Sequence, residues 1–292
     1  MGVNLDARQR AMLSDMRVPW IWPVAEHATN VVAARVDESG DKAQIHAKNS
    51  ILTPRAPEPV RTPDPLSPLE KTVDMAERDW AALEALVGPC TACKLCQGRT
   101  QTVFGVGPAP SAAGQPPRVD WLIVGEAPGE NEDKQGEPFV GQAGKLLDNM
   151  LKTVGLSRSG QGEYAGRALQ GAYIANVIKC RPPGNRNPEP AEIAACAPYL
   201  VRQIELLAPK MILALGRFAA QTLLAETVEG VQALPLGKLR SRVHRWRGIP
   251  VVVSYHPAYL LRSPVEKGKA WADLWLALKT WQAAQEEIAQ GL

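Results

Sequence analysis

The stretch Val119-Asp-Trp-Leu-Ile-Val-Gly-Glu-Ala-Pro-Gly129 decides the fold of this chain. Its first six residues are a short apolar run, which predicts a buried strand. Gly125 ends the run and opens a loop that continues to Asp133 and carries several carboxylates. Parallel α/β sheets bind their ligands beyond the carboxyl ends of the strands, so the loop is a candidate functional segment.

The same pattern of an apolar run followed by a helix recurs along the chain. Further strands are predicted over 173–178, 211–215 and 249–254. Helical periodicity predicts helices over 76–87, 142–154, 188–207, 216–224 and 266–285. Strands that alternate with helices imply βαβ units, so we expect an α/β protein with a central four-stranded parallel sheet covered on both faces.

Residues 1–75 differ in composition from the rest and are predicted to be an N-terminal extension. Residues 6–23 combine a short helical pattern with the aromatic cluster Pro19-Trp-Ile-Trp-Pro23. Six prolines lie from Pro54 to Pro68 inclusive. Proline blocks both helices and sheet ladders, so 24–75 is interpreted as a disordered linker. The peptide 6–23 is either a docking site for a protein partner or an inert tail, and 76–292 is the globular domain, expected to be a monomer.

Charge and hydropathy narrow the function classes. The formal net charge is +3, and residues 76–292 hold 24 Lys and Arg against 20 Asp and Glu, a weak lean towards an anionic partner such as nucleic acid. No apolar run reaches the roughly 20 residues of a membrane span. The first residues are charged where a signal peptide would be apolar, so a cytoplasmic location is expected.

Four of the five cysteines have the spacing of a metal or cluster site. Cys90 and Cys93 form C-x2-C, and Cys180 and Cys196 form C-x15-C. In a reducing compartment such pairs are better explained as ligands than as disulfides, although four unrelated buried thiols are the alternative. Four thiolates bind either zinc or an iron–sulfur cluster, and the spacing does not decide between them. Cys96 is interpreted as a spare, partly buried thiol.

Three polar segments are predicted to converge on one crevice. Residues 125–133, 176–183 and 256–262 each follow or close a predicted strand. The carboxyl ends of parallel strands meet at one edge of the sheet, which is where these segments therefore lie.

Three side chains in or near these segments are suited to binding a planar base. Asn176 lies inside an apolar strand, where an amide is costly unless it is hydrogen-bonded. His256, at a strand end, can donate to an oxygen that gains charge, and Phe139 can stack on a base. Each residue also has a simpler structural interpretation, as a backbone-bonded amide, a capping histidine or a packed aromatic side chain.

These residues belong to four motifs that resemble, in order, those of the family 4 uracil-DNA glycosylases. The resemblance covers about residues 78–285. The motifs are Cys90-x2-Cys93-x-Leu95-x3-Arg99-x3-Val103-Phe-Gly105, Gly125-Glu-Ala-Pro-Gly-Glu-Asn-Glu-Asp133-x2-Gly136-x-Pro138-Phe-Val-Gly-x-Ala-Gly144, Asn176-Val-Ile-Lys-Cys-Arg-Pro-Pro183 and His256-Pro-Ala-Tyr-Leu-Leu-Arg262.

The resemblance implies a three-layer α/β/α sandwich with a [4Fe-4S] cluster, which it favours over zinc. The implied reaction is removal of uracil from single- or double-stranded DNA, a step of base excision repair. No lysine is placed for a Schiff base, so we expect a monofunctional enzyme that leaves an abasic site.

The resemblance also implies roles for individual residues. The cluster ligands would be Cys90, Cys93, Cys180 and Cys196. The uracil pocket would be formed by Gly125, Glu126, Ala127, Phe139, Asn176 and His256. The wedge that fills the gap left by the flipped nucleotide would fall at Leu260, Leu261 and Arg262. Arg99, Lys179 and Arg181, beside the cysteines, are expected to contact DNA phosphates.

The sequence offers more than one candidate for the residue that activates water. Another uracil glycosylase family has an aspartate where this chain has Ala127, so the candidates are Glu126, Glu132 and Asp133, with Glu126 preferred and Glu132 second. Rival interpretations are a glycosylase of the same fold for another deaminated base, a non-catalytic iron–sulfur DNA-binding module linked to replication, and a zinc-stabilised binding protein.

Overall fold

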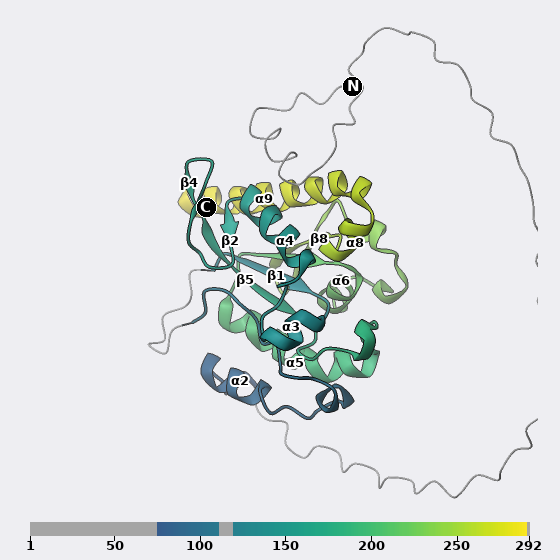
Figure 1. Ribbon diagram of the computed structural model, residues 1–292. Coiled ribbons are helices and arrows are strands. Elements are labelled where there is room, and N and C mark those ends of the chain that lie inside the picture. The colour runs from purple at the N-terminus through teal and green to yellow at the C-terminus, as the bar shows by residue number, and fades with distance from the viewer. Residues whose placement is uncertain (1–74, 111–118, 291–292) are drawn as a thin grey trace, which may run out of the picture. The chain divides into compact units, whose positions relative to one another are not determined.

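The computed structural model describes residues 75–110 and 119–290, so the predicted extension lies almost wholly outside the described residues. The central sheet has six strands in the order β2-β5-β1-β6-β8-β7 (Figure 1). Its four inner strands are parallel, which confirms the predicted core of the sheet. The strands of this sheet are β1 (Trp121–Gly125), β2 (Leu156–Ser157), β5 (Gln170–Asn176), β6 (Met211–Leu215), β7 (Val243–Trp246) and β8 (Ile249–Ser254).

The two edge strands were not predicted. β2 is only two residues long, and β7, Val-His-Arg-Trp, is a mostly unburied segment of mixed polarity that pairs antiparallel with β8. Neither has the apolar run that marks a buried strand. A separate two-stranded hairpin consists of β3 (Glu163–Tyr164) and β4 (Arg167–Ala168).

Helices cover both faces of the sheet, which gives the three layers. Within the described residues the α-helices are α2 (Trp80–Val87), α3 (Glu130–Gln135), α4 (Gln142–Thr153), α5 (Pro190–Leu207), α6 (Arg217–Leu223), α7 (Leu236–Leu239), α8 (Pro257–Arg262) and α9 (Lys267–Ala289). The 3-10 helices are η1 (Met75–Glu77), η2 (Lys94–Gln97), η3 (Pro183–Asn185), η4 (Val231–Ala233) and η5 (Pro264–Glu266). Figure 1 shows α4 and α9 on one side of the sheet and α5 on the other.

Alternating side chains of the strands form two cores. Leu122 and Val124 of β1 pack in the core that α5 and α6 cover, whereas Trp121 and Ile123 pack in the core under α4 and α9. Successive side chains of a strand point to opposite faces, so both faces of this strand are apolar because both are covered.

No helix of the described residues is long and apolar enough to cross a membrane.

Local signals explain where several helices begin and end. The Asp79 carboxylate accepts a hydrogen bond from the Ala82 N–H, so α2 begins at Trp80 and not at residue 76. Proline occupies the first position of α5 and of α8, where its missing N–H costs nothing. The acidic loop expected over 125–133 contains the start of α3, which extends to Gln135 and ends at Gly136 with φ of 77°.

Candidate active site

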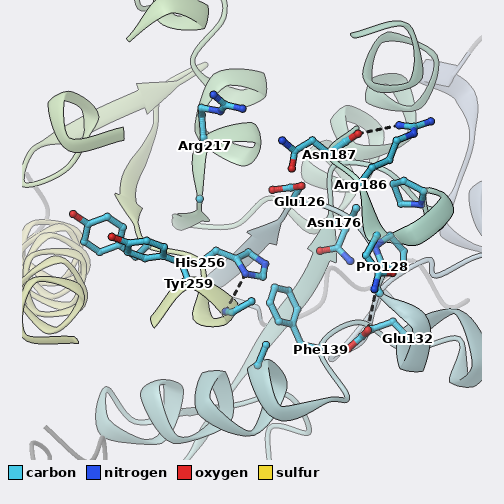
Figure 2. A pocket seen from close by; sticks show the side chains of 18 of the residues that line it. Glu126, Pro128, Glu132, Phe139, Asn176, Arg186, Asn187, Arg217, His256 and Tyr259 are labelled. Carbon is cyan, nitrogen blue, oxygen red and sulfur yellow. Dashed lines mark hydrogen bonds between the residues drawn. The ribbon is translucent and has the colours of Figure 1, made fainter. Parts of the chain in front are cut away.

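A crevice of about 650 Å³ opens at the carboxyl ends of the four parallel strands (Figure 2). A residue following or ending each strand lines it: Glu126 after β1, Asn176 at the end of β5, Gly216 after β6 and His256 after β8. The structure therefore brings together the three segments that the sequence predicts to converge.

Asn176 presents an unused hydrogen-bond acceptor inside this crevice. Its side chain is 2% exposed, and its Oδ1 atom has no hydrogen-bond partner within the described residues. Gly125 pairs with Asn176 in the sheet register, and a Cβ atom at Gly125 would collide with that Oδ1 atom. A buried acceptor without a partner is costly, so this atom is suited to a ligand that donates a hydrogen bond.

Phe139 is held in an unusual backbone conformation next to Asn176. Its φ is 56°, a left-handed value that non-glycine residues seldom adopt. The Arg158 guanidinium donates a hydrogen bond of 2.9 Å to the Phe139 carbonyl, and Gly144 leaves room for that carbonyl, because a Cβ atom there would overlap it. The ring stacks on the His256 imidazole at 5.3 Å between centroids, with planes 28° apart (Figure 2).

The His256 imidazole is fixed in one tautomer by its position at the start of α8. Its Nδ1 atom accepts a hydrogen bond of 3.2 Å from the Ala258 N–H (Figure 2), so in the neutral ring the proton lies on Nε2. Burial and, to a smaller extent, the charge of Arg262 lower the pKa of His256 to about 4, with Glu132 opposing. At neutral pH the side chain is therefore an uncharged donor.

Glu126 is the carboxylate of the crevice that is not held by backbone amides. Burial raises the pKa of its carboxyl, and the Arg217 guanidinium offsets part of that rise. Figure 2 shows Glu126 on the wall of the crevice with Asn187 and Arg217, opposite Phe139. A carboxylate with a raised pKa is a stronger base than an ordinary exposed one, as general base catalysis requires.

The carboxylate of Glu132 links two loops of the crevice. It accepts hydrogen bonds from the N–H groups of Gly129 at 3.1 Å, Val140 at 2.9 Å and Gly141 at 3.2 Å. Three amide donors leave it poorly placed to accept a proton from water, so a positioning role fits Glu132 better than the activation of water. Asp133, the third candidate, does not line the crevice: its buried carboxylate accepts from the Thr100 N–H at 3.0 Å.

The four paired cysteines line a second, small pocket together with Arg99, Lys179 and Tyr199. All are free thiols. Three of their sulfurs accept hydrogen bonds: Cys90 from the Tyr199 hydroxyl at 3.2 Å, Cys180 from Arg99 at 3.2 Å and Cys196 from the Lys179 N–H at 3.3 Å. Within residues 75–110 and 119–290, no three His, Cys, Asp or Glu side chains are grouped closely enough to hold one metal ion.

Comparison with known proteins identifies the family. A family model described as the uracil DNA glycosylase superfamily matches residues 112–279. A type-4 uracil-DNA glycosylase of Pyrobaculum aerophilum is 38% identical over 200 residues, which are 67% of this chain and 91% of that protein. The chain belongs to the type-4 uracil-DNA glycosylases. Proteins of the same name from Sulfurisphaera tokodaii and Thermotoga maritima are each 42% identical, over 60% and 61% of this chain and 72% and 80% of their own lengths.

Two side chains that were expected to contact DNA phosphates, Lys179 and Arg99, make other contacts in the structure. Lys179 is 1% exposed, and its ammonium donates to the Asn176 carbonyl at 2.9 Å and to Gln203 Oε1 at 2.6 Å. Arg99 donates to the carbonyls of Cys90 and Gly88 as well as to a cysteine sulfur, so it is committed to the cysteine pocket. The prediction for Lys179 was wrong, because adjacency to a cysteine in sequence says nothing about which way a long side chain points.

The predicted wedge also needs correction. Leu260 is fully buried in the core with α4 and α9, whereas Leu261 is 43% exposed. Leu261 and Arg262, both exposed on α8, stay available for DNA. Arg181 is partly exposed and forms an ion pair of 3.3 Å with Glu130.

Sequence reasoning missed Arg217, Asn187 and Tyr255, which also line the crevice. The glycine after the predicted strand 211–215 was a usable signal for Arg217. Gly216 has φ of 90°, and its position beyond a strand end is where α/β sheets place ligand-binding residues.

Replacing Glu132 by Gln tests its role as a link between loops. An amide cannot accept at both ends, so one backbone N–H loses its partner, and we expect the free energy of unfolding in urea to fall by about 1–3 kcal/mol. Tryptophan fluorescence measures the transition. The matched control is Glu130→Gln, two residues earlier on the exposed side of α3, which should change stability little. Equal stability of the two variants would contradict the role.

Proposed function

We propose that the protein hydrolyses the N-glycosidic bond of a uracil flipped out of DNA, leaving an abasic site for base excision repair. Membership of the type-4 family supports this reaction. The observation that carries it is the buried Oδ1 atom of Asn176 in the crevice, which has no hydrogen-bond partner among residues 75–110 and 119–290. This acceptor calls for a base with an N–H group on its edge.

Asn176 would distinguish uracil from cytosine. Its Oδ1 atom accepts the N3–H of uracil, and its amide group can donate to O4. Cytosine has no hydrogen on N3 and has an amino group in place of O4, so both atoms of the Asn176 amide would face groups of their own kind. Sites built to bond a polar edge reject analogues that lack it, because the buried partner is left unsatisfied.

His256 would stabilise the leaving group. Cleavage of the bond places negative charge on the uracil, chiefly at O2 and N1. The Nε2–H group, fixed by the hydrogen bond between Nδ1 and Ala258, is free to donate to O2. A preorganised neutral donor strengthens its bond as the charge develops, and it does so without a proton being transferred.

Glu126 would orient the attacking water and stabilise the cationic sugar. Its carboxylate lies in the crevice, and the raised pKa favours proton uptake from water as the new C–O bond forms. Phe139 would contact the face of the base, and Gly125 and Ala127 would allow close approach of the backbone. Leu261 would enter the gap in the strand, because it is exposed and Leu260 is not.

The cysteine pocket fits a [4Fe-4S] cluster better than a single zinc ion. Four thiols line one pocket, yet they are not grouped around a single point, and a cluster bonds each thiolate through a different iron. Cys90, Cys93, Cys180 and Cys196 would hold it, and bound there it would supply a structural cross-link between the loop after α2, the segment that follows β5, and α5. Arg99 and Tyr199 would donate to the ligand sulfurs.

Incubation with a uracil-containing single strand, followed by alkali, tests the activity. The wild-type protein should produce a break at the uracil, whereas Asn176→Ala and His256→Ala should each lower kcat/KM by roughly 100-fold or more, because each removes a bond to the reacting base. Asn149→Ala, an exposed amide outside the crevice, is the control and should retain wild-type rates. A wild-type protein that leaves the strand intact would refute the proposal.

The pH dependence tests Glu126 as the base. Its pKa is raised, so kcat/KM should fall as the pH falls through that value, since protonation removes the base. This fall is the acid limb of the pH profile. His256 has a pKa of about 4, so it stays uncharged at higher pH and causes no change in kcat/KM near neutral pH. Glu126→Gln should be slow and should lack the acid limb, whereas Glu163→Gln on the β3–β4 hairpin should keep it. An unchanged acid limb in Glu126→Gln would rule this base out.

Visible absorption tests the cluster. The purified protein should be brown, and Cys196→Ala should lose the colour together with iron and sulfide content. Cys96→Ala is the matched control, since this thiol does not line the cysteine pocket, and it should stay brown. A colourless, zinc-containing and active wild-type protein would show that the metal is misassigned.

A further inference from the structure

A stretch of 36 residues beside the crevice contains no acidic residue. Residues 230–265 have six Lys and Arg and no Asp or Glu, although the whole chain is only mildly basic. They form α7, β7, β8 and α8. Such a local excess of one sign concentrates positive potential at one side of the crevice.

Four exposed cations line the crevice or lie near its lining in the chain, at the carboxyl end of the sheet. Arg217 and Arg262 line the crevice itself. Lys238 lies on α7, two residues after Leu236, which also lines the crevice. Arg242 directly precedes β7. The first residue of β7 pairs with Val252, which lies near the carboxyl end of β8, and His256 follows that end. We call Arg217, Lys238, Arg242 and Arg262 the cationic rim.

The side chains of the cationic rim differ from the cations on the cysteine side in their ion pairs with carboxylates. None of its four side chains forms an ion pair with a carboxylate in the part of the chain that the structure describes. On the cysteine side, by contrast, Lys94, Arg181 and Arg186 are paired with Glu189, Glu130 and Glu192. Lys238, Arg242 and Arg262 therefore keep their charge for an external anion, whereas Arg217 also acts on the Glu126 carboxylate.

A buried anchor fixes the segment that carries Lys238 and Arg242. Arg240, midway between them, is 7% exposed and donates to Asp273 Oδ2 at 2.7 Å and to the Lys269 carbonyl at 2.8 Å. Its guanidinium lies 4.1 Å from the centroid of the Tyr255 ring, which lines the crevice. The backbone between the two cations is therefore anchored to α9 and to Tyr255, so binding an anion does not require this backbone segment to be ordered.

We propose that the cationic rim binds the phosphates of the DNA strand on one side of the flipped nucleotide, with Lys238 and Arg242 reaching phosphates beyond the crevice. The inference rests on the proposed function and relocates the backbone contacts from the cysteine side to the α7–β7 side. The ligand is a nucleic-acid backbone, read without regard to base sequence.

The test is the double variant Lys238→Gln/Arg242→Gln of the full chain. With a uracil-containing single strand, KM should rise on the order of 10-fold near 0.1 M salt while kcat stays unchanged, because the lost contacts are remote from the reacting bond. The salt dependence of binding to a fluorescent strand without uracil should also weaken. The slope of log Kd against log salt should fall by about 0.7 for each lost contact.

Arg245→Gln is the matched control. It removes the same charge from β7, but Arg245 pairs with Pro250 and so lies three residues, roughly 10 Å, farther from the crevice end of the sheet. It should leave KM and the salt slope near wild type. An unchanged KM and slope in the double variant, or an equal effect of Arg245→Gln, would overturn the cationic rim. Failure of the proposed function would look different, since the wild-type protein would then bind the strand without cleaving it.

Discussion

The close packing of Gly125 against Asn176 is the constraint on which the rest of the site depends. These residues are partners at the last position of the β1–β5 register, and the missing side chain of Gly125 is what leaves room for the Asn176 amide and the Phe139 ring. The register is fixed in turn by apolar side chains on both faces of β1, since a slip of one residue would exchange the two cores. The position of the Asn176 amide is therefore set by the hydrophobic core.

A second set of buried polar contacts connects this position to the cysteine pocket. Lys179 bonds the Asn176 carbonyl and Gln203, and Gln203 donates to the Phe104 carbonyl at 3.1 Å. Burial lowers the pKa of Lys179 to about 8, and the negative field of Cys196 opposes that shift. Thiolate ligands next to this lysine would favour its charged form, so a filled cysteine pocket would also strengthen the bond that holds the Asn176 backbone.

Much of the fold was predictable because the inner strands carry the strongest signal that a sequence offers, a short apolar run between helices. Residues 211–215 and 249–254 match β6 and β8 residue for residue. The edge strand β7 was not predictable from periodicity, because an exposed antiparallel edge needs no apolar run. The crevice residues were found because strand ends of a parallel sheet meet at one edge, whatever the details of the loops.

Side-chain direction was the part that the sequence could not supply. Leu260 and Leu261 are neighbours of equal hydropathy, yet one lies in the core and the other in solvent, since they lie on different faces of a short helix. Lys179 and Arg181 are separated by one residue, and only Arg181 reaches the surface. Such differences depend on what packs against each element, and that is a property of the assembled tertiary structure.

The capping of α8 by His256 has a consequence for fidelity. The imidazole is bonded to the first turn of a helix of six residues whose other end carries Leu261 and Arg262. A helix this short is stiff along its length, so any displacement of its exposed end by DNA would reach the imidazole at its start. Reading of the distorted duplex and activation of the leaving group would then be parts of one mechanical event, a checkpoint that an unflipped nucleotide would fail.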